Sequence, residues 1–149
     1  MIELIRTSGK DQDFASLVNH LDAYLAEKDG KEHSFYNQYN GISNIDYALI
    51  CYSHRTPVSC GAIKEFGTDA MEVKRMFTLP ENRGQGLAYK VLSELEYWAK
   101  ELGAKRLVLE TGKRQLEAIR LYERSGFQRI PNYGQYVGIE NSVCFEKSV

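Results

Sequence analysis

The sequence predicts a mixed α/β (α+β) fold, in which one central, mostly antiparallel sheet is flanked by helices. Three observations predict this class. Short runs of aliphatic and β-branched residues recur along the chain, separate segments carry apolar residues at helical spacing, and the two kinds of segment alternate from end to end. The 149 residues contain no internal repeat, linker or low-complexity stretch, so we expect a single domain over residues 1–149.

The chain is expected to begin with a strand and a helix. Residues 2–6 alternate between apolar and polar side chains, which predicts the strand. Asp11 or Asp13 can cap the helix that follows, and Gly30 marks its end. The apolar positions that predict this helix are Phe14, Leu17, Val18, Leu21 and Leu25.

Further strands and two more helices complete the predicted architecture. A broad apolar stripe predicts a helix that ends near Gly103, and its members are Leu87, Ala88, Val91, Leu92, Leu95, Trp98, Ala99 and Leu102. A shorter helix is expected from Leu116 to Ser125, with Gly126 as its stop. Strands are expected at 46–53, 57–66, 71–79 and 105–110, with two more after Phe127 around a loop at 131–141.

The overall charge and the cysteines argue against several classes of function. Charged residues make up 26% of the chain but the formal net charge is −1, and no long run of Lys or Arg is present, so no nucleic-acid partner is expected. No leader-like or membrane-spanning apolar stretch is found, so we expect a cytoplasmic protein without a membrane partner. Cys51, Cys60 and Cys144 show no CxxC spacing, which predicts reduced thiols and no metal site.

The segment from Glu81 to Ala88, ENRGQGLA, carries the clearest functional signal. It joins a predicted strand to a predicted helix and contains Gly84 and Gly86. At such a junction the first amides of the helix have no intrahelical partner, and the positive end of the helix favours phosphate. No Lys-Ser/Thr pair follows, as it would in a P-loop, and the pattern does not continue to GxGxxG. We therefore expect a phosphorylated ligand of another kind.

Two motifs resemble those of the GNAT acyltransferase superfamily, which uses acetyl-coenzyme A. The first is Arg/Gln-x-x-Gly-x-Gly/Ala at the strand-to-helix junction, met here by Arg83, Gly86 and Ala88. The second is Ala-x-x-x-Tyr-x-x-x-Gly-Phe, and its members here are Ala118, Tyr122, Gly126 and Phe127. Either motif alone is weak, but the two in this order are specific. The resemblance implies the GNAT fold, acetyl-CoA as cosubstrate and N-acetyl transfer.

The resemblance also implies where the cofactor binds. The pyrophosphate is expected on the backbone amides of the loop, which consists of Arg83, Gly84, Gln85, Gly86, Leu87 and Ala88, and the glycines allow close approach. The strand 71–79 is expected to splay from its neighbour and to pair with the pantetheine arm through Met76, Phe77, Thr78 and Leu79. The Arg83 side chain points to phosphate or to solvent. Gln115 stands where many relatives carry a cofactor-contacting Asn.

Acyl transfer to an amine needs a base and an acid. An alkylamine is protonated at neutral pH, so a base must remove a proton, and the resemblance implies Glu72. The alternative is a solvent-facing carboxylate or an ion-pair partner of Lys74. Tyr122 matches the family's general acid for the leaving thiolate, and the alternative is a core tyrosine bonded to the backbone. A backbone N–H near Thr78 would stabilise the oxyanion.

The acceptor pocket is expected to be aromatic. Its candidate residues are His33, Tyr36, Arg75 and Tyr136, with Tyr39, Lys74 and Tyr133 beside them. Arg75, opposite in phase to Glu72 on its strand, can receive a carboxylate, although a surface charge is the simpler interpretation. These residues suit a small carboxylate-bearing amine such as an amino acid, while protein N-termini and lysines remain open.

A different class of function also fits the motifs. A cofactor-binding module without transfer activity, such as an acyl-CoA sensor, would keep the glycine loop but would not need both Glu72 and Tyr122. The presence of both residues favours an enzyme. A homodimer is common in the family, although no feature of the sequence identifies an interface.

Overall fold

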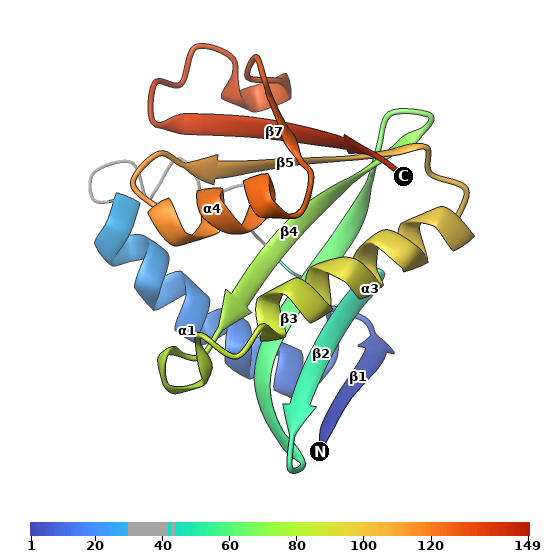
Figure 1. The fold of residues 1–149 in the computed structure, drawn as a ribbon, viewed down its shortest axis with the longest axis vertical. Coiled ribbons are helices and arrows are strands. Elements are labelled where there is room, and N and C mark those ends of the chain that lie inside the picture. Colours follow the sequence, from blue (N-terminus) through green and yellow to red (C-terminus); the bar gives the residue numbers. More distant parts are fainter. Residues whose placement is uncertain (30–41, 43) are drawn as a thin grey trace.

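A single sheet forms the centre of the fold. The computed structural model describes residues 1–29, 42 and 44–149 (Figure 1). Seven strands of these residues pair in the order β1-β2-β3-β4-β5-β7-β6, and each neighbouring pair is antiparallel except β4 and β5, which are parallel. The strands are β1 (Ile2–Thr7), β2 (Tyr47–Ser53), β3 (Thr56–Phe66), β4 (Ala70–Thr78), β5 (Arg106–Gly112), β6 (Gln128–Ile130) and β7 (Ser142–Ser148). The predicted mixed, mostly antiparallel sheet is confirmed.

Helices cover both faces of this sheet. In Figure 1, α1 (Gln12–Asp29) lies behind the strands, and α3 (Leu87–Glu101) and α4 (Leu116–Arg124) lie in front of them. Asp11 rather than Asp13 caps α1, because its Oδ1 accepts the N–H groups of Asp13 and Phe14 at 2.8 and 3.2 Å. Two short 3₁₀ turns, Pro80–Asn82 and Gly134–Tyr136, lie where the sequence predicts loops. None of the helices in the described residues is both long and apolar enough to cross a membrane.

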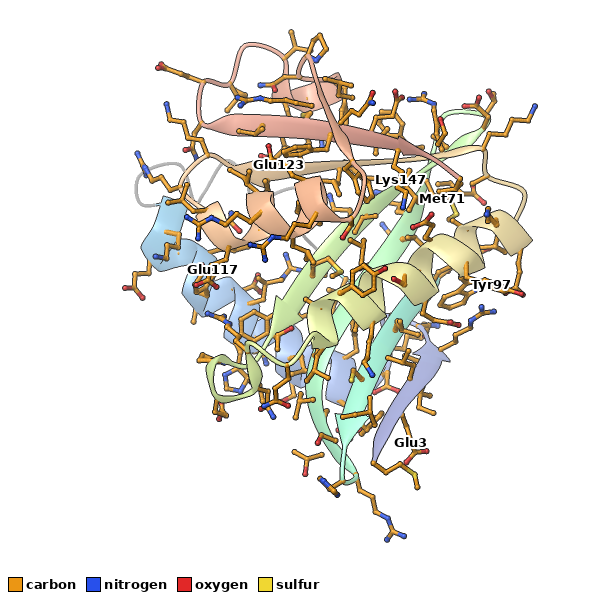
Figure 2. The ribbon with its side chains drawn as sticks, in the orientation of Figure 1. Glu3, Met71, Tyr97, Glu117, Glu123 and Lys147 are labelled. Carbon is orange, nitrogen blue, oxygen red and sulfur yellow. The ribbon has the colours of Figure 1, made fainter. Side chains whose placement is uncertain are left out.

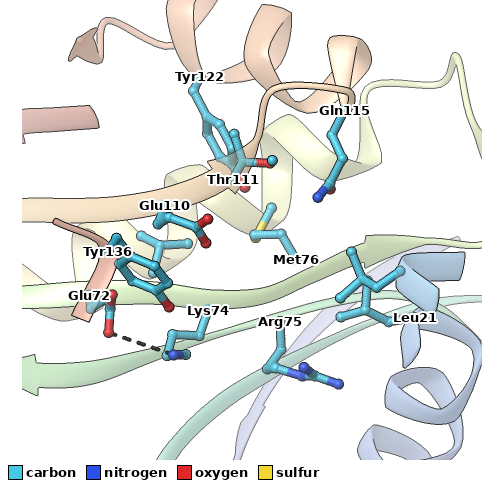
Figure 3. Close-up of a pocket in the computed structure, with 13 residues that line it drawn as sticks. Leu21, Glu72, Lys74, Arg75, Met76, Glu110, Thr111, Gln115, Tyr122 and Tyr136 are labelled. Atoms are coloured by element: carbon cyan, nitrogen blue, oxygen red, sulfur yellow. Dashed lines mark ion pairs between the residues drawn. The ribbon is translucent and has the colours of Figure 1, made fainter. Parts of the chain in front are cut away.

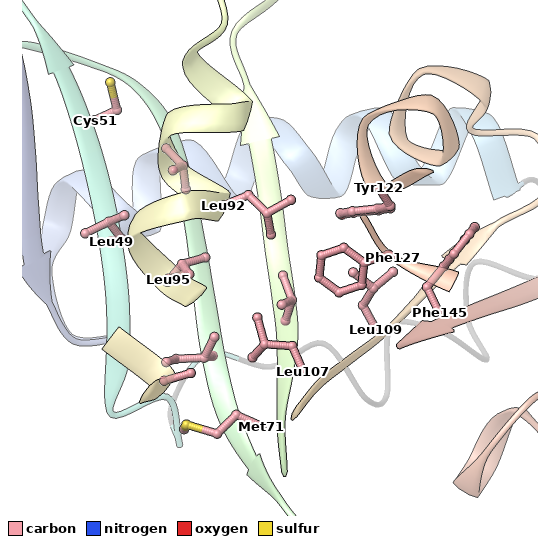
Figure 4. Close-up of a cluster of buried hydrophobic side chains, with 14 of the residues drawn as sticks. Leu49, Cys51, Met71, Leu92, Leu95, Leu107, Leu109, Tyr122, Phe127 and Phe145 are labelled. Atoms are coloured by element: carbon pink, nitrogen blue, oxygen red, sulfur yellow. The ribbon is translucent and has the colours of Figure 1, made fainter. Parts of the chain in front are cut away.

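Each face of the sheet has its own apolar core. The predicted stripe of α3 packs on the front face (Figure 4), in a cluster that includes Leu49, Val73, Val91, Leu92, Leu95, Leu107, Leu109, Phe127 and Phe145. The cluster behind the sheet joins α1 to the strands through Phe14, Leu17, Val18, Leu21, Ile50, Ala62 and Phe77. Leu102 departs from the predicted stripe, because α3 ends before it and its side chain is 43% exposed.

The outer side of α3 is polar and is linked to β1, at one edge of the sheet, and to β7, next to the other edge. Lys147 of β7 reaches Glu96 with an Nζ–Oε2 distance of 3.0 Å, while Tyr97 is exposed (Figure 2). Arg6 of β1 lies 4.8 Å from the centre of the Trp98 ring and pairs with Glu101 at 2.7 Å. Partly exposed ion pairs of this kind contribute about 0–1 kcal/mol each, so the apolar stripe holds α3 in place.

β4 is paired on both sides only in its first half. β5 pairs with Ala70 to Val73 of β4, and then the two strands separate. β5 continues to Gly112 alongside β7, and β4 continues to Thr78 alongside β3. The two strands therefore form a V that opens beyond Val73, which confirms the splay implied by the family resemblance.

A β-bulge lies in β4 where the V opens. One residue of β3, Gly61, faces two residues of β4, Arg75 and Met76. Arg75 adopts a left-handed conformation with a φ of 58°. The extra residue reverses the alternation of side chains, so that Val73 and Met76 both pack in the front core although they are three positions apart. Phe77 then packs into the core behind the sheet.

Gly61 allows the bulged strand to lie close to α3. A Cβ at this position would lie 2.5 Å from Met76 Sδ, 2.8 Å from Leu95 Cδ1 and 3.0 Å from Val91 Cγ1. These distances are shorter than van der Waals contacts, so a side chain at Gly61 would displace the helix or the bulge.

Candidate active site

The open end of the V leads into two adjoining cavities. The larger, which we call the groove, has a volume of about 460 Å³ and lies between the glycine loop, the end of β4 and α4. The smaller, the inner cavity, has a volume of about 80 Å³ and lies between β4, β5 and the 134–136 turn (Figure 3). Leu21, Met76 and Gln115 line both, so the two cavities meet at these residues.

The glycine loop forms one end of the groove. Gly84 and Gly86 have φ angles of 80° and 77°, and no atom of the described residues lies within 4 Å of a Cβ built on either. Their backbone conformation therefore favours glycine, and each leaves the space beside the chain open. Gly86 precedes α3 and no side chain caps the helix, so the amides of its first turn, at Leu87, Ala88 and Tyr89, are available to a ligand in the groove.

The Arg83 side chain contacts both β4 and α1. Its Nε donates to the carbonyl of Thr78 at 2.9 Å. Its guanidinium carbon lies 5.2 Å from the centre of the Tyr24 ring and 5.6 Å from that of Phe77. The side chain thus fastens the loop to β4 and α1. Its charge still lines the groove, together with Arg120 and Arg124 of α4 and one opposing carboxylate, Glu117.

The predicted cofactor strand is only partly exposed to the groove. Met76, Phe77 and Thr78 line it. Leu79 instead packs between the two cores, and its N–H donates to the carbonyl of Val58 at 2.9 Å. Gln85 is exposed in the loop and is absent from the described lining of the groove. These two predicted contacts are therefore the least supported by the geometry.

Tyr122 of α4 lies in the inner cavity. Its side chain is buried against Phe127 and Phe145, with ring centres 5.8 and 6.1 Å away. Burial, assisted by the charge of Glu110, raises the pKa of Tyr122 well above its usual range, so the hydroxyl keeps its proton and can donate it. Gln115 directly precedes α4, and Figure 3 shows its side chain directed toward Met76 at the junction of the cavities.

Glu72 is buried and engaged. Its Oε2 accepts the hydroxyl of Tyr133 at 2.5 Å, and its Oε1 lies 3.8 Å from Lys74 Nζ. The alternative of a solvent-facing carboxylate is wrong, because Glu72 is 7% exposed, and the ion pair with Lys74 is confirmed. Burial lowers the pKa of Lys74, which the Glu72 charge partly offsets.

Glu110 is a charged residue of this cavity that the sequence did not single out. It lies on β5, beyond the point where β5 leaves β4, and Figure 3 shows it beside Tyr136 and facing the cavity. Burial is the main reason why the pKa of Tyr122 and that of Tyr136 are raised, and the charge of Glu110 adds to this effect. The sequence does offer a signal for Glu110, because this carboxylate directly follows the apolar run of residues 107–109 in a predicted strand.

The structure corrects the prediction for Arg75. The bulge turns this side chain to the same cavity as Glu72, although simple alternation places them on opposite faces. Arg75 is also no surface charge, because its side chain is 2% exposed. Tyr136 is buried and lines the same cavity, as expected. His33, Tyr36 and Tyr39 lie outside the described residues. Among those described, no group of three His, Cys, Asp or Glu residues is placed to hold a metal.

Comparisons with known proteins agree with this geometry. The sequence matches the profile of the Acetyltransferase (GNAT) family over residues 14–127. It is 31% identical to the IAA acetyltransferase of Azospirillum brasilense, over 98% of this chain and 97% of that protein. A Klebsiella pneumoniae structure, named as an acyl-CoA N-acyltransferase, is 31% identical with a TM-score of 0.84, over 99% of this chain and 97% of that one. PaiA N-acetyltransferase from Thermoplasma acidophilum, in complex with coenzyme A, shares the fold with a TM-score of 0.70 and 18% identity, over 100% and 99% of the two chains.

The splayed strands and the glycine junction define the class of protein as an acyltransferase. The match to the family profile covers most of the chain, and the bacterial relatives align along nearly all of it. The chain belongs to the GNAT acetyltransferase family.

Proposed function

We propose that this protein transfers an acetyl group from acetyl-CoA to the primary amine of a small molecule, by direct attack in a ternary complex. The observation that carries the proposal is the junction of the two cavities at the open end of the V. The groove offers backbone amides and arginines to an anionic cofactor. The inner cavity offers the carboxylates of Glu72 and Glu110 to an amine, and Tyr122 lines the same cavity.

In this proposal the pyrophosphate lies on the first-turn amides of α3. Hydrogen bonds to a charged group contribute about 1.5–3 kcal/mol each, so three or four of them suffice to anchor the cofactor. The pantetheine arm then lies along Met76 to Thr78, where β4 lacks a second neighbouring strand among the described residues. The thioester reaches the junction near Met76 and Gln115.

The reaction begins when the neutral amine nitrogen forms a bond to the thioester carbonyl carbon. A carboxylate takes the proton that the nitrogen loses, and a backbone N–H of β4 near Thr78 stabilises the oxyanion. The carbon–sulfur bond then breaks, and Tyr122 donates its hydroxyl proton to the departing thiolate. The acetylated amine and coenzyme A are the products.

Two carboxylates of the inner cavity are candidates for the base. Glu72, the residue implied by the family resemblance, is held by Tyr133 and Lys74. Glu110 acts electrostatically on Tyr122, the proposed acid. Both carboxylates line the inner cavity and the charges of both act on Lys74, so either can be the proton acceptor. The pH–rate profiles of Glu110→Gln and Glu72→Gln identify the base. The variant that lacks the base should have its acid limb shifted to higher pH, and the other variant should not.

The proposed function is tested by thermal melting with acetyl-CoA, together with release of free thiol in the presence of pooled small amines. A ligand at about 100 times its dissociation constant stabilises by about 2.7 kcal/mol, so the melting temperature should rise clearly. Stabilisation with thiol release supports the transferase. Stabilisation without release from small amines, but with release from peptides, supports a protein acetyltransferase instead. Stabilisation without release from any acceptor supports a sensor module, and no stabilisation contradicts the assignment of the groove.

A further inference from the structure

Arg75 has features that the proposed reaction does not use. It is a non-glycine residue in a left-handed conformation in the middle of a strand, with a φ of 58°. Such a conformation costs about 1–2 kcal/mol for an L-residue and persists only where the surrounding structure imposes it. The bulge that creates it places Arg75 among the residues that line the inner cavity, and Figure 3 shows the guanidinium directed toward Leu21 of α1.

The hydrogen bonds of Arg75 are incomplete. Its Nη2 pairs with Asp22 Oδ1, from the α1 helix. Within the described residues its buried Nε has no hydrogen-bond partner, although the side chain is 98% buried. A guanidinium presents five donors in a planar fork that matches a carboxylate, and a buried donor without a partner is unfavourable. The Nε edge is therefore suited to a further acceptor.

The charges of the inner cavity are separated along its length. Glu72 and Glu110 lie beside Tyr136, whereas Arg75 lies toward Leu21 of α1, with Lys74 between the two groups (Figure 3). A ligand that carries both an amine and a carboxylate can place each charge near its opposite in this arrangement. A simple alkylamine would engage only one end of it.

We propose that the acceptor is a small amine that bears a carboxylate, and that Arg75 binds this carboxylate while Asp22 occupies the guanidinium in its absence. This inference rests on the proposed function and names the class of its acceptor. Asp22 is 39% exposed in its side chain and lies on a helix outside the sheet, so it can turn to solvent when a ligand carboxylate arrives. Because a buried guanidinium without a counter-ion is unfavourable, Asp22 keeps the empty cavity stable.

The experiment compares matched ligands in the intact protein. The twenty standard amino acids are each assayed by thiol release against their α-carboxamides and their decarboxylated amines, and in parallel by thermal melting in the presence of coenzyme A. At least one acid should exceed its amide and its amine by about tenfold or more in kcat/KM, because a site built for a polar group rejects analogues that lack it. Acids that bind should also raise the melting temperature more than their amides.

Two substitutions assign the preference to Arg75. Arg75→Lys keeps the charge but removes the planar fork, so the KM of the acid should rise about tenfold while the KM of any amide turned over stays unchanged. Asp22→Asn removes the competing charge and should lower the KM of the acid. Arg55→Lys is the matched control, because Arg55 is exposed and also left-handed, with a φ of 69°.

Each outcome decides between the two proposals. Equal turnover or equal stabilisation by acids and amides overturns carboxylate recognition and leaves the transferase intact. Equal effects of Arg75→Lys on acid and amide also overturn it, provided that coenzyme A still stabilises the variant as it does the parent. No stabilisation of the parent by coenzyme A and no thiol release contradict the proposed function itself.

Discussion

The two halves of β4 differ in what lies beside them. From Ala70 to Val73 the strand has β3 on one side and β5 on the other, and its apolar side chains are buried in the front core. From Lys74 to Thr78 it has β3 alone among the described strands, it bulges, and its side chains line both cavities. The nine residues of this strand thus include a half that is paired on both sides and a half with an open edge. The paired half fixes the position of the open edge.

The difference shows how a binding site can be made from regular structure. Losing one neighbouring strand exposes backbone groups that would otherwise be paired, which is unfavourable in a sheet unless a ligand or water takes their place. The bulge adds a second change, because it directs Arg75 into the inner cavity. The following predictions test whether the two halves act separately, from the largest expected effect to the smallest.

Removing the Tyr122 hydroxyl should have the largest effect on turnover, and it should leave the paired half of β4 unaffected. Tyr122→Phe keeps the packing against Phe127 and Phe145 but removes the proton donor, so kcat should fall about 10²–10⁴-fold. The rise in melting temperature with acetyl-CoA should be unchanged. Tyr97→Phe, on the exposed side of α3, is the control. Unchanged turnover in Tyr122→Phe would remove this residue from catalysis.

Truncating a side chain beside the paired half should reduce stability without affecting binding. Leu107 pairs with Met71 and is fully buried, so Leu107→Ala should lower the free energy of unfolding by about 2–5 kcal/mol in urea. Its KM for acetyl-CoA should remain near the parent value. Met76→Ala, on the open half, should cause a smaller loss of stability than Leu107→Ala and should raise the KM for acetyl-CoA. Similar KM effects from both would mean that the halves are not separable.

A methyl group at Gly61 should affect both stability and cofactor binding. Gly61→Ala places a Cβ against Met76, Leu95 and Val91, so we expect a loss of about 1–3 kcal/mol in the free energy of unfolding. Because α3 must move away from the sheet, its first-turn amides should move too, and the KM for acetyl-CoA should rise. Gly67→Ala is the control for KM. Its positive φ of 67° makes alanine unfavourable there too, but no atom of the described residues lies within 4 Å of its Cβ, so the KM should stay unchanged. An unchanged KM in Gly61→Ala would show that the groove is independent of this contact.

Alkaline pH should weaken the open half through Cys60. Its thiol donates to the carbonyl of Arg75 at 3.4 Å, and burial raises its pKa to about 12 from an ordinary value of 9.0. Because the folded pKa is the higher one, this stabilisation is present in full below pH 9 and is lost as pH rises toward 12. Between pH 9 and 10.5, Cys60→Ala should therefore lose stability less steeply than the parent, by at most about 1.4 kcal/mol per pH unit. Parallel slopes would contradict the assignment.

Local patterns were sufficient to predict most of the architecture. The apolar stripe of α3 and the glycine that ends it lie within one segment, so periodicity alone indicates the helix and its buried face. The glycine loop was equally accessible, because its positive φ angles depend on the residues themselves. The position of Tyr122 followed from a motif that begins in α4 and ends at Phe127, just after the helix.

What the sequence could not supply depends on register between distant segments. The bulge arises where Gly61 meets two residues of β4, and neither strand shows this by itself, so the phase of Arg75 was predicted wrongly. Glu110 becomes a site residue only because β5 leaves β4 after Leu109. Arg83 turns toward Thr78 and two rings from separate elements, contacts that the loop sequence does not encode.

The arginines of the groove have a kinetic consequence. A chain with a formal net charge of −1 lines this groove with Arg83, Arg120 and Arg124, against one carboxylate, Glu117, among the described residues. Such a local excess of positive charge attracts anions over a distance of about one Debye length, ~10 Å at 0.1 M salt, and accelerates their capture. Backbone amides, in contrast, act only at contact. Added salt should therefore slow the association of a polyphosphate ligand far more than it hastens dissociation.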